Sequence, residues 1–231
     1  MNNQKSIEYH NIKFKYSYVK SDPSGLGCIK ELVENDEYKL FKYTNSNGIF
    51  IDIEKNHGVA SIILAIQNPN PTIYVLEPYP ELVERIQNNL KINNINNVIV
   101  IDKALGDNNN VKLSISNQYS GATSTLVTDT SNFSQRYKGY RQIEVKTISF
   151  DNLLKEYNID TVELLKIDCE GGEYYLYDSI MFKQKCVKNI TGEFHNLSYN
   201  LYKNPKWNTD DLTNFVKKYV ENDINLSYLT I

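Results

Sequence analysis

Short apolar runs recur along the chain from residue 49 onward, and stretches with helical spacing separate several of them. Runs without polar alternation are typical of strands that are buried on both faces of a sheet. The stretch at 80–90 places apolar residues every three or four positions, as in an amphipathic helix, whereas the stretch at 59–66 is too apolar for an exposed helix. The runs lie at 49–51, 73–76, 98–101, 162–167 and 187–194, and the predicted helices at 59–66, 80–90 and 150–157. This order predicts an α/β fold: a mostly parallel sheet with helices on both faces, a three-layer sandwich.

Two parts of the chain depart from this rhythm. In residues 108–150, apolar and polar positions alternate, which predicts the strands of a partly exposed hairpin. Residues 1–48 show the weakest periodicity, and we expect them to form a cap on the sheet within the same domain as residues 49–231.

The carboxyl-terminal third carries three further predictions. A helix follows the 162–167 run and passes through Tyr174 and Ile180. The last helix has its apolar face at 212–220 with Thr209 as its N-cap, and residues 224–231 form a terminal strand.

Two acids stand at the ends of adjacent predicted strands. Asp52 ends the first apolar run, Glu77 ends the second, and a helix lies between them. At the carboxyl edge of a parallel sheet this arrangement describes a nucleoside site, with Glu77 placed to accept hydrogen bonds from ribose hydroxyls. The competing interpretation, polar residues that merely end strands, is the weaker one.

A second polar group surrounds the ends of the later strands. Asp168 follows the 162–167 run and is the first candidate for orienting or deprotonating an acceptor hydroxyl. His195 and Glu193 lie two residues apart and therefore on one strand face, which makes His195 the second candidate base. Glu170 is a further candidate catalytic residue beside Asp168, Glu193 and His195. Glu173 is interpreted as a surface carboxylate at a helix N-terminus.

Two interpretations at this edge stay open. Asp168, Glu170, Glu193 and His195 have the ligand types of a divalent-cation site, but sequence separation carries no geometry, so we assign no metal ligand. Asp102, at the end of the 98–101 run, is either a solvated strand end or a contact to adenine.

Composition narrows the class of protein. The net charge of −3 disfavours a nucleic-acid partner, and no apolar run is long enough for a membrane span. Cys28, Cys169 and Cys186 are odd in number and lack zinc-like spacing, which favours a reducing, cytoplasmic location.

Several short motifs together resemble the FkbM-type methyltransferases over about residues 48 to 196. The matching residues are Asp52, Asn56 and Gly58 in the first motif, Glu77-Pro78, Ala104-Leu105-Gly106-Asp107, the block from Lys166 to Glu173, and Glu193 with His195. The resemblance implies the Rossmann-like class I methyltransferase fold, S-adenosylmethionine as cofactor, and a hydroxyl of a sugar, glycan or similar small molecule as acceptor. The cofactor contacts it implies are Asp52, Glu54, Asn56, Gly58, Glu77, Pro78, Asp102, Ala104 and Asp168, with a homodimer kept as an option.

The sequence departs from the family pattern at Glu54-Lys55, where the family has Gly-Ala. A side chain at residue 54 competes for space with the methionine part of the cofactor, and its carboxylate repels the carboxylate of the cofactor. The alternative function is therefore a catalytically inactive binding or scaffolding protein that has lost the cofactor.

Overall fold

The computed structural model describes residues 2–53, 57–118, 123–124, 139–196 and 208–230. A six-stranded sheet forms the centre, in the order β12-β11-β10-β3-β4-β5, and every neighbouring pair in it is parallel. Its strands are β3 (Phe50–Ile53), β4 (Ile73–Leu76), β5 (Val98–Ile101), β10 (Val162–Ile167), β11 (Val187–Asn196) and β12 (Ile224–Thr230). The predicted α/β fold is confirmed, and the strand order is that of the Rossmann fold, with its reversal between β3 and β10.

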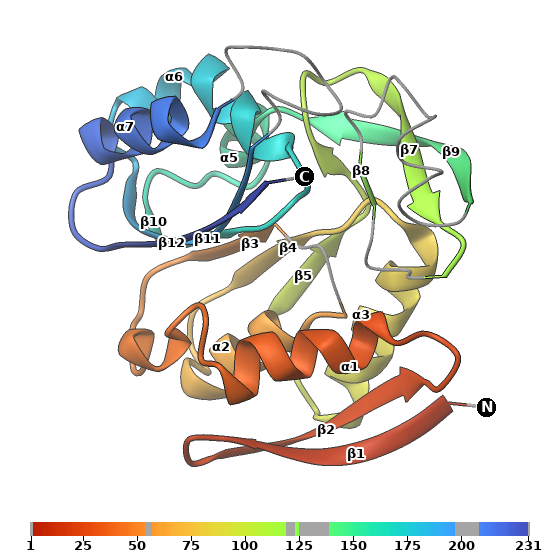
Figure 1. Ribbon diagram of the computed structural model, residues 1–231. Helices are drawn as coiled ribbons and strands as arrows, with labels where there is room; N and C mark the ends of the chain where they lie inside the picture. Colours follow the sequence, from red (N-terminus) through yellow and green to blue (C-terminus); the bar gives the residue numbers. More distant parts are fainter. Residues whose placement is uncertain (1, 54–56, 119–122, 125–138, 197–207, 231) are drawn as a thin grey trace.

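Helices cover both faces of this sheet, as Figure 1 shows. One face carries α5 (Phe150–Glu156), α6 (Ile180–Lys183) and α7 (Thr209–Tyr219), and the other carries α2 (Val59–Gln67) and α3 (Pro80–Ile92). Ile51 and Ile53 belong to the apolar core beneath α5, α6 and α7, whereas Phe50 belongs to the core beneath α2 and α3. Alternate residues of a strand point to opposite faces, so both faces of β3 are apolar and the run reads as continuous.

The amino-terminal segment lies over α2 on the second face. It contains the antiparallel hairpin of β1 (Asn2–Tyr9) and β2 (Ile12–Val19), then α1 (Ser24–Ile29), the π-helical turn η1 (Lys30–Glu34) and the 3-10 turn η2 (Leu40–Tyr43). Phe14, Tyr16 and Leu32 are buried against the side chains of α2. Because α2 lies between the sheet and the hairpin, all its residues except Ile66 are buried, which explains why it is apolar on most sides.

A smaller sheet stands beside the central one, in the order β6-β9-β7-β8. Its strands are β6 (Ala104–Leu105), β7 (Asn110–Ser116), β8 (Thr123–Ser124) and β9 (Tyr140–Ile148). β7 and β9 pair antiparallel, as the alternating pattern of residues 108–150 predicts. Leu113, Ile115 and Val145 pack against Tyr79 and Leu82 at the start of α3.

Two helix predictions need correction. The segment through Tyr174 is a 3-10 helix, η3 (Gly172–Asp178), and α6 begins separately because the Ser179 hydroxyl accepts the Phe182 N–H at 3.0 Å as its N-cap. The N-cap of α7 is Asn208, whose side-chain oxygen accepts the Asp211 N–H at 2.8 Å, and Thr209 is already helical. Among the described residues, none of the helices has the length and apolar character needed to cross a membrane.

Candidate active site

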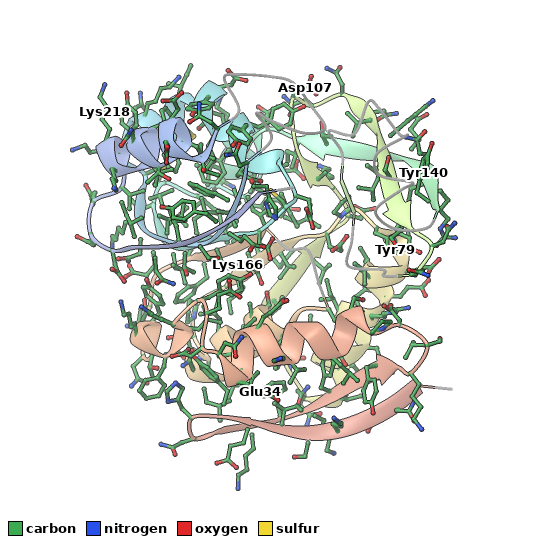
Figure 2. All side chains as sticks on the ribbon, in the orientation of Figure 1. Glu34, Tyr79, Asp107, Tyr140, Lys166 and Lys218 are labelled. Atoms are coloured by element: carbon green, nitrogen blue, oxygen red, sulfur yellow. The ribbon has the colours of Figure 1, made fainter. Side chains whose placement is uncertain are left out.

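Asp52 and Lys166 form a buried ion pair where the strand order reverses. The two residues are neighbours in the β3–β10 register, and Lys166 Nζ lies 3.3 Å from Asp52 Oδ1. Asp52 Oδ2 accepts a hydrogen bond of 2.5 Å from the Ser61 hydroxyl of α2. Buried charges persist only when they are paired, so the Asp52 carboxylate is held in one orientation. Figure 2 shows Lys166 near the centre of the molecule.

Glu77 is a buried carboxylate with one oxygen unused. Glu77 Oε1 accepts the Tyr79 N–H at 2.7 Å, whereas the buried Oε2 has no hydrogen-bond partner among the described residues. Burial raises the pKa of Glu77 well above its usual range. A ribose diol would supply the missing donors, so this residue fits the nucleoside part of the cofactor.

Gly58 shapes the turn between β3 and α2. It is the N-cap of α2 with a φ of 78°, and a Cβ there would lie 3.0 Å from the Ile86 side chain of α3. Glycine adopts this left-handed backbone at little cost, and the missing side chain lets the turn pass close to α3. The predicted contacts Glu54 and Asn56, together with Lys55, lie outside the described residues.

The ends of β10 and β11 bring three carboxylates to one imidazole nitrogen. Ile167 pairs with Gly192, so Asp168 and Glu193 follow at the same level of the sheet. His195 Nε2 lies 3.9 Å from Asp168 Oδ1, 3.5 Å from Glu170 Oε2 and 3.4 Å from Glu193 Oε2. We call Asp168, Glu170 and Glu193, gathered around His195 Nε2, the carboxylate cluster.

Glu173 fixes His195 from the opposite side, which corrects the prediction that Glu173 is a surface residue. Its side chain is fully buried, and its Oε1 lies 3.0 Å from His195 Nδ1 and accepts the His195 N–H at 2.7 Å. Its Oε2 accepts the Gly171 N–H at 2.8 Å. Burial alone would lower the pKa of His195, but the carboxylates of Glu170 and Glu173 outweigh burial and raise it well above its usual range.

The turn after β10 orients Glu170 toward the cluster. Glu170 has a φ of 52°, and the following Gly171 has a φ of 106°, so the chain reverses tightly and turns Glu170 back toward His195. Few residues other than glycine adopt a left-handed backbone, and such conformations gather at functional sites.

Tyr38 reaches this site from the amino-terminal segment. Its hydroxyl donates a hydrogen bond of 2.8 Å to Asp168 Oδ2, and Lys166 Nζ lies 5.1 Å from the centre of its ring. Burial raises the pKa of Tyr38 well above its usual range, so the phenol keeps its proton as a hydrogen-bond donor.

The structure therefore gathers most, but not all, of the predicted site residues. Asp168, Glu170, Glu193 and His195 lie together, and Asp52 and Glu77 stand at the ends of β3 and β4. Asp102 is exposed, Ala104 is buried in β6 and Pro78 is half-buried.

Sequence reasoning missed Tyr38, Lys166 and Glu173 as parts of the site. The block from Lys166 to Glu173 carried a signal for two of them, because its charged residues follow a buried strand. Tyr38 had none, since its contact with Asp168 joins residues 130 positions apart.

A comparison with protein families places the chain in one of them. The family described as "Methyltransferase FkbM domain" matches residues 52–219, which is more than half of the chain. A search among curated proteins found no significant match. Among solved structures, the crystal structure of M. jannaschii TYW2 in complex with AdoMet is 20% identical over 42% of this chain and 42% of its own, with a TM-score of 0.31. That overlap is too small to carry an argument. The family match and the fitting carboxylate at Glu77 lead to one conclusion: the chain belongs to the FkbM methyltransferase family, with S-adenosylmethionine as its cofactor.

Proposed function

We propose that the protein transfers a methyl group from S-adenosylmethionine to a hydroxyl oxygen of a sugar, a glycan or a similar small molecule. The observation that carries the proposal is the buried carboxylate cluster at the carboxyl edge of the sheet, beside the strands whose ends hold Asp52 and Glu77. Carboxylates accept hydrogen bonds from hydroxyl groups and accept their protons, so the cluster suits an alcohol as acceptor.

The cofactor would be held through its nucleoside part. Glu77 Oε2 offers a buried acceptor to the ribose hydroxyls. Gly58, the N-cap of α2, has no side chain that would keep the cofactor away from the start of this helix. The Asp52 carboxylate is held at this edge of the sheet by its ion pair with Lys166 and its hydrogen bond from Ser61. S-adenosylmethionine supplies an electrophilic methyl group on a sulfonium centre.

The acceptor chemistry requires positioning and the removal of one proton. The hydroxyl oxygen attacks the methyl carbon as the carbon–sulfur bond breaks, which yields a methyl ether and S-adenosylhomocysteine. Asp168 is the first candidate to orient the hydroxyl and take its proton, and Tyr38 holds Asp168 through its hydroxyl. The raised pKa of His195, the second candidate base in the sequence, favours its protonated form and leaves proton removal to Asp168. Glu173 holds the imidazole of His195, while Glu170 and Glu193 line the same space. Alignment of the oxygen with the methyl carbon supplies much of the rate in such displacements.

Two measurements test the proposal. Calorimetric titration with S-adenosylmethionine and S-adenosylhomocysteine measures binding, and mass spectrometry of incubations with a panel of sugars and oligosaccharides detects a methyl ether. Asp168→Asn should reduce kcat by about a hundredfold or more, with cofactor affinity nearly unchanged. Glu163→Gln is the control, since Glu163 lies on β10, outside the cluster, and pairs with Lys188. Unchanged turnover in Asp168→Asn would remove its assigned role.

The same titration addresses the alternative of an inactive scaffold. No binding by the unmodified chain, with binding restored by Glu54→Gly, would support loss of the cofactor through Glu54-Lys55. If nitrogen-containing acceptors are methylated and hydroxyl acceptors are not, the protein is a methyltransferase but the proposed transfer to a hydroxyl oxygen is wrong.

A further inference from the structure

We propose that Asp168, Glu193 and His195 bind one divalent cation of the Mg²⁺ and Mn²⁺ class, with Glu170 as a fourth ligand, and that this ion holds the acceptor hydroxyl. The binding site stands on the geometry alone. The role given to the ion rests on the proposed function.

The first observation is the spacing of the ligand atoms. One atom from each of Asp168, Glu193 and His195 lies within 4.8 Å of the others. Ligands on opposite sides of an ion are about 4 to 5 Å apart for the bond lengths of Mg²⁺ and Ca²⁺. The three side chains therefore need only small movements to share one ion, and Glu170 Oε2 lies 3.5 Å from the same imidazole nitrogen.

The second observation is the imidazole nitrogen itself. His195 is fully buried, and its Nε2 has no hydrogen-bond partner among the described residues although it faces the carboxylate cluster. Its other ring nitrogen, Nδ1, lies 3.0 Å from Glu173 Oε1. With Nδ1 held by Glu173, Nε2 is the ring nitrogen that would lose its proton to a dication and coordinate it, beside the three facing carboxylates.

The third observation is that hydrogen bonds hold the ligand side chains in place, as in known metal sites. Metal-binding histidines usually give their second ring nitrogen to a carboxylate, and ligating carboxylates are themselves hydrogen-bonded. Glu173 fills the first role for His195, and the Tyr38 hydroxyl fills the second for Asp168 at 2.8 Å. These contacts orient the ligand atoms toward one another before any ion arrives.

Charge favours a dication over a monovalent cation. Asp168, Glu170, Glu173 and Glu193 place four carboxyl groups around one imidazole, and all but Glu193 are buried. Lys166, the buried cation on β10, is paired with Asp52. Carboxylate oxygens suit Mg²⁺ and Mn²⁺, and the imidazole ligand favours Mn²⁺ of the two. Bound there, the ion would polarise the acceptor hydroxyl and so assist removal of its proton.

Direct binding of Mn²⁺ tests the site without any acceptor. Calorimetry and electron paramagnetic resonance on the metal-free full chain should show one Mn²⁺ per chain, and thermal unfolding should shift upward with Mn²⁺ concentration. Asp168→Asn and Glu193→Gln should each weaken Mn²⁺ binding at least tenfold, and Glu173→Gln about tenfold through the orientation of His195. Glu163→Gln, on β10 outside the cluster, should bind as the unmodified chain does.

Two results would overturn the proposal. One is the absence of Mn²⁺ and Mg²⁺ binding at millimolar concentration, which would leave a protonated His195 paired with the carboxylates. The other is unchanged affinity in Asp168→Asn and Glu193→Gln variants that circular dichroism shows to be folded. Methyl transfer that survives EDTA would overturn the role of the ion while the binding data stand. If no acceptor is methylated, the binding data still decide whether the site exists.

Discussion

At the scale of single residues, Glu77 is a buried carboxylate at the proposed cofactor site, and its burial opposes stability. Its carboxylate is buried, one oxygen accepts the Tyr79 N–H, and the other has no partner among the described residues. The charged form is costly in the free protein because burial removes its hydration. The free protein therefore bears this cost at a position where a bound nucleoside would supply hydrogen-bond donors.

Glu77→Gln should separate stability from binding. The folded-state pKa of Glu77 is raised, so the stability that its protonation provides is complete below its unfolded pKa and is lost as pH rises. The variant lacks this loss, so its free energy of unfolding should exceed that of the unmodified protein by more at pH 8 than at pH 5. Its affinity for S-adenosylmethionine should fall about tenfold or more, because hydrogen bonds to charged groups are the stronger ones.

Urea unfolding at both pH values and calorimetry check this prediction, with Glu81→Gln as the control at an exposed carboxylate in the first turn of α3. A less stable Glu77→Gln at pH 8, or one with unchanged cofactor affinity, would contradict the assignment.

Residue type and position at a strand end were enough to predict that Asp52, Glu77 and Asp168 lie at the carboxyl edge of the sheet. Glu173 was misplaced for a physical reason: the prediction assumed a solvated helix start, whereas the chain forms a buried 3-10 turn. Which face a short turn buries depends on packing against β11, and the local sequence does not encode that contact.

At the scale of the elements, the close approach of β10 and β11 depends on Gly192. It lies opposite Ile167 with a φ of 157°, and a Cβ there would lie 1.8 Å from the Ile167 carbonyl oxygen. That atom belongs to the backbone of the neighbouring strand, so no side-chain rotation relieves the overlap. Asp168 directly follows β10 and His195 lies on β11, so separation of the two strands would spread the carboxylate cluster.

Gly192→Ala should therefore destabilise the fold by roughly 3 kcal/mol or more. The matched control is Gly27→Ala in α1, where a Cβ would meet nothing within 4 Å and alanine should be neutral or stabilising by up to about 1 kcal/mol. Urea unfolding followed by circular dichroism measures both changes. A Gly192→Ala variant as stable as the unmodified protein would show that the strands accommodate the methyl group.

Element prediction worked best where burial is complete. The parallel strands are apolar on both faces, so their runs could be recognised without partners. It failed at η3 and α6, where the Ser179 cap divides one apparent helical stretch into two. A cap of this kind depends on one side-chain hydrogen bond, and serine is also common within loops.

At the scale of the whole molecule, polar contacts as well as apolar packing join the amino-terminal segment to α3. Arg85 of α3 lies 2.5 Å from the Asp22 carboxylate and donates to His57 Nε2 at 2.9 Å. Asn89 accepts the Ser17 N–H of β2 at 2.8 Å. These contacts join residues 28 to 72 positions apart, so the local sequence of residues 1–48 carried no signal for them.

The histidine in this network predicts how overall stability responds to acid. Burial, and then the positive charge of Arg85, lower the pKa of His57 to about 4. The unfolded chain binds a proton near pH 6.5 and the folded chain does not, so stability is complete above pH 6.5 and falls as pH drops toward 4. Between pH 7 and pH 5 the loss from this residue should be about 2 kcal/mol.

His57→Gln keeps an acceptor for Arg85 without a titrating ring, so its free energy of unfolding should change less over this range. Urea titrations at pH 7, 6 and 5 measure the slope, with His10→Gln as the control at an exposed histidine. Equal slopes for the unmodified protein and His57→Gln would mean that His57 is not the group whose protonation opens this interface.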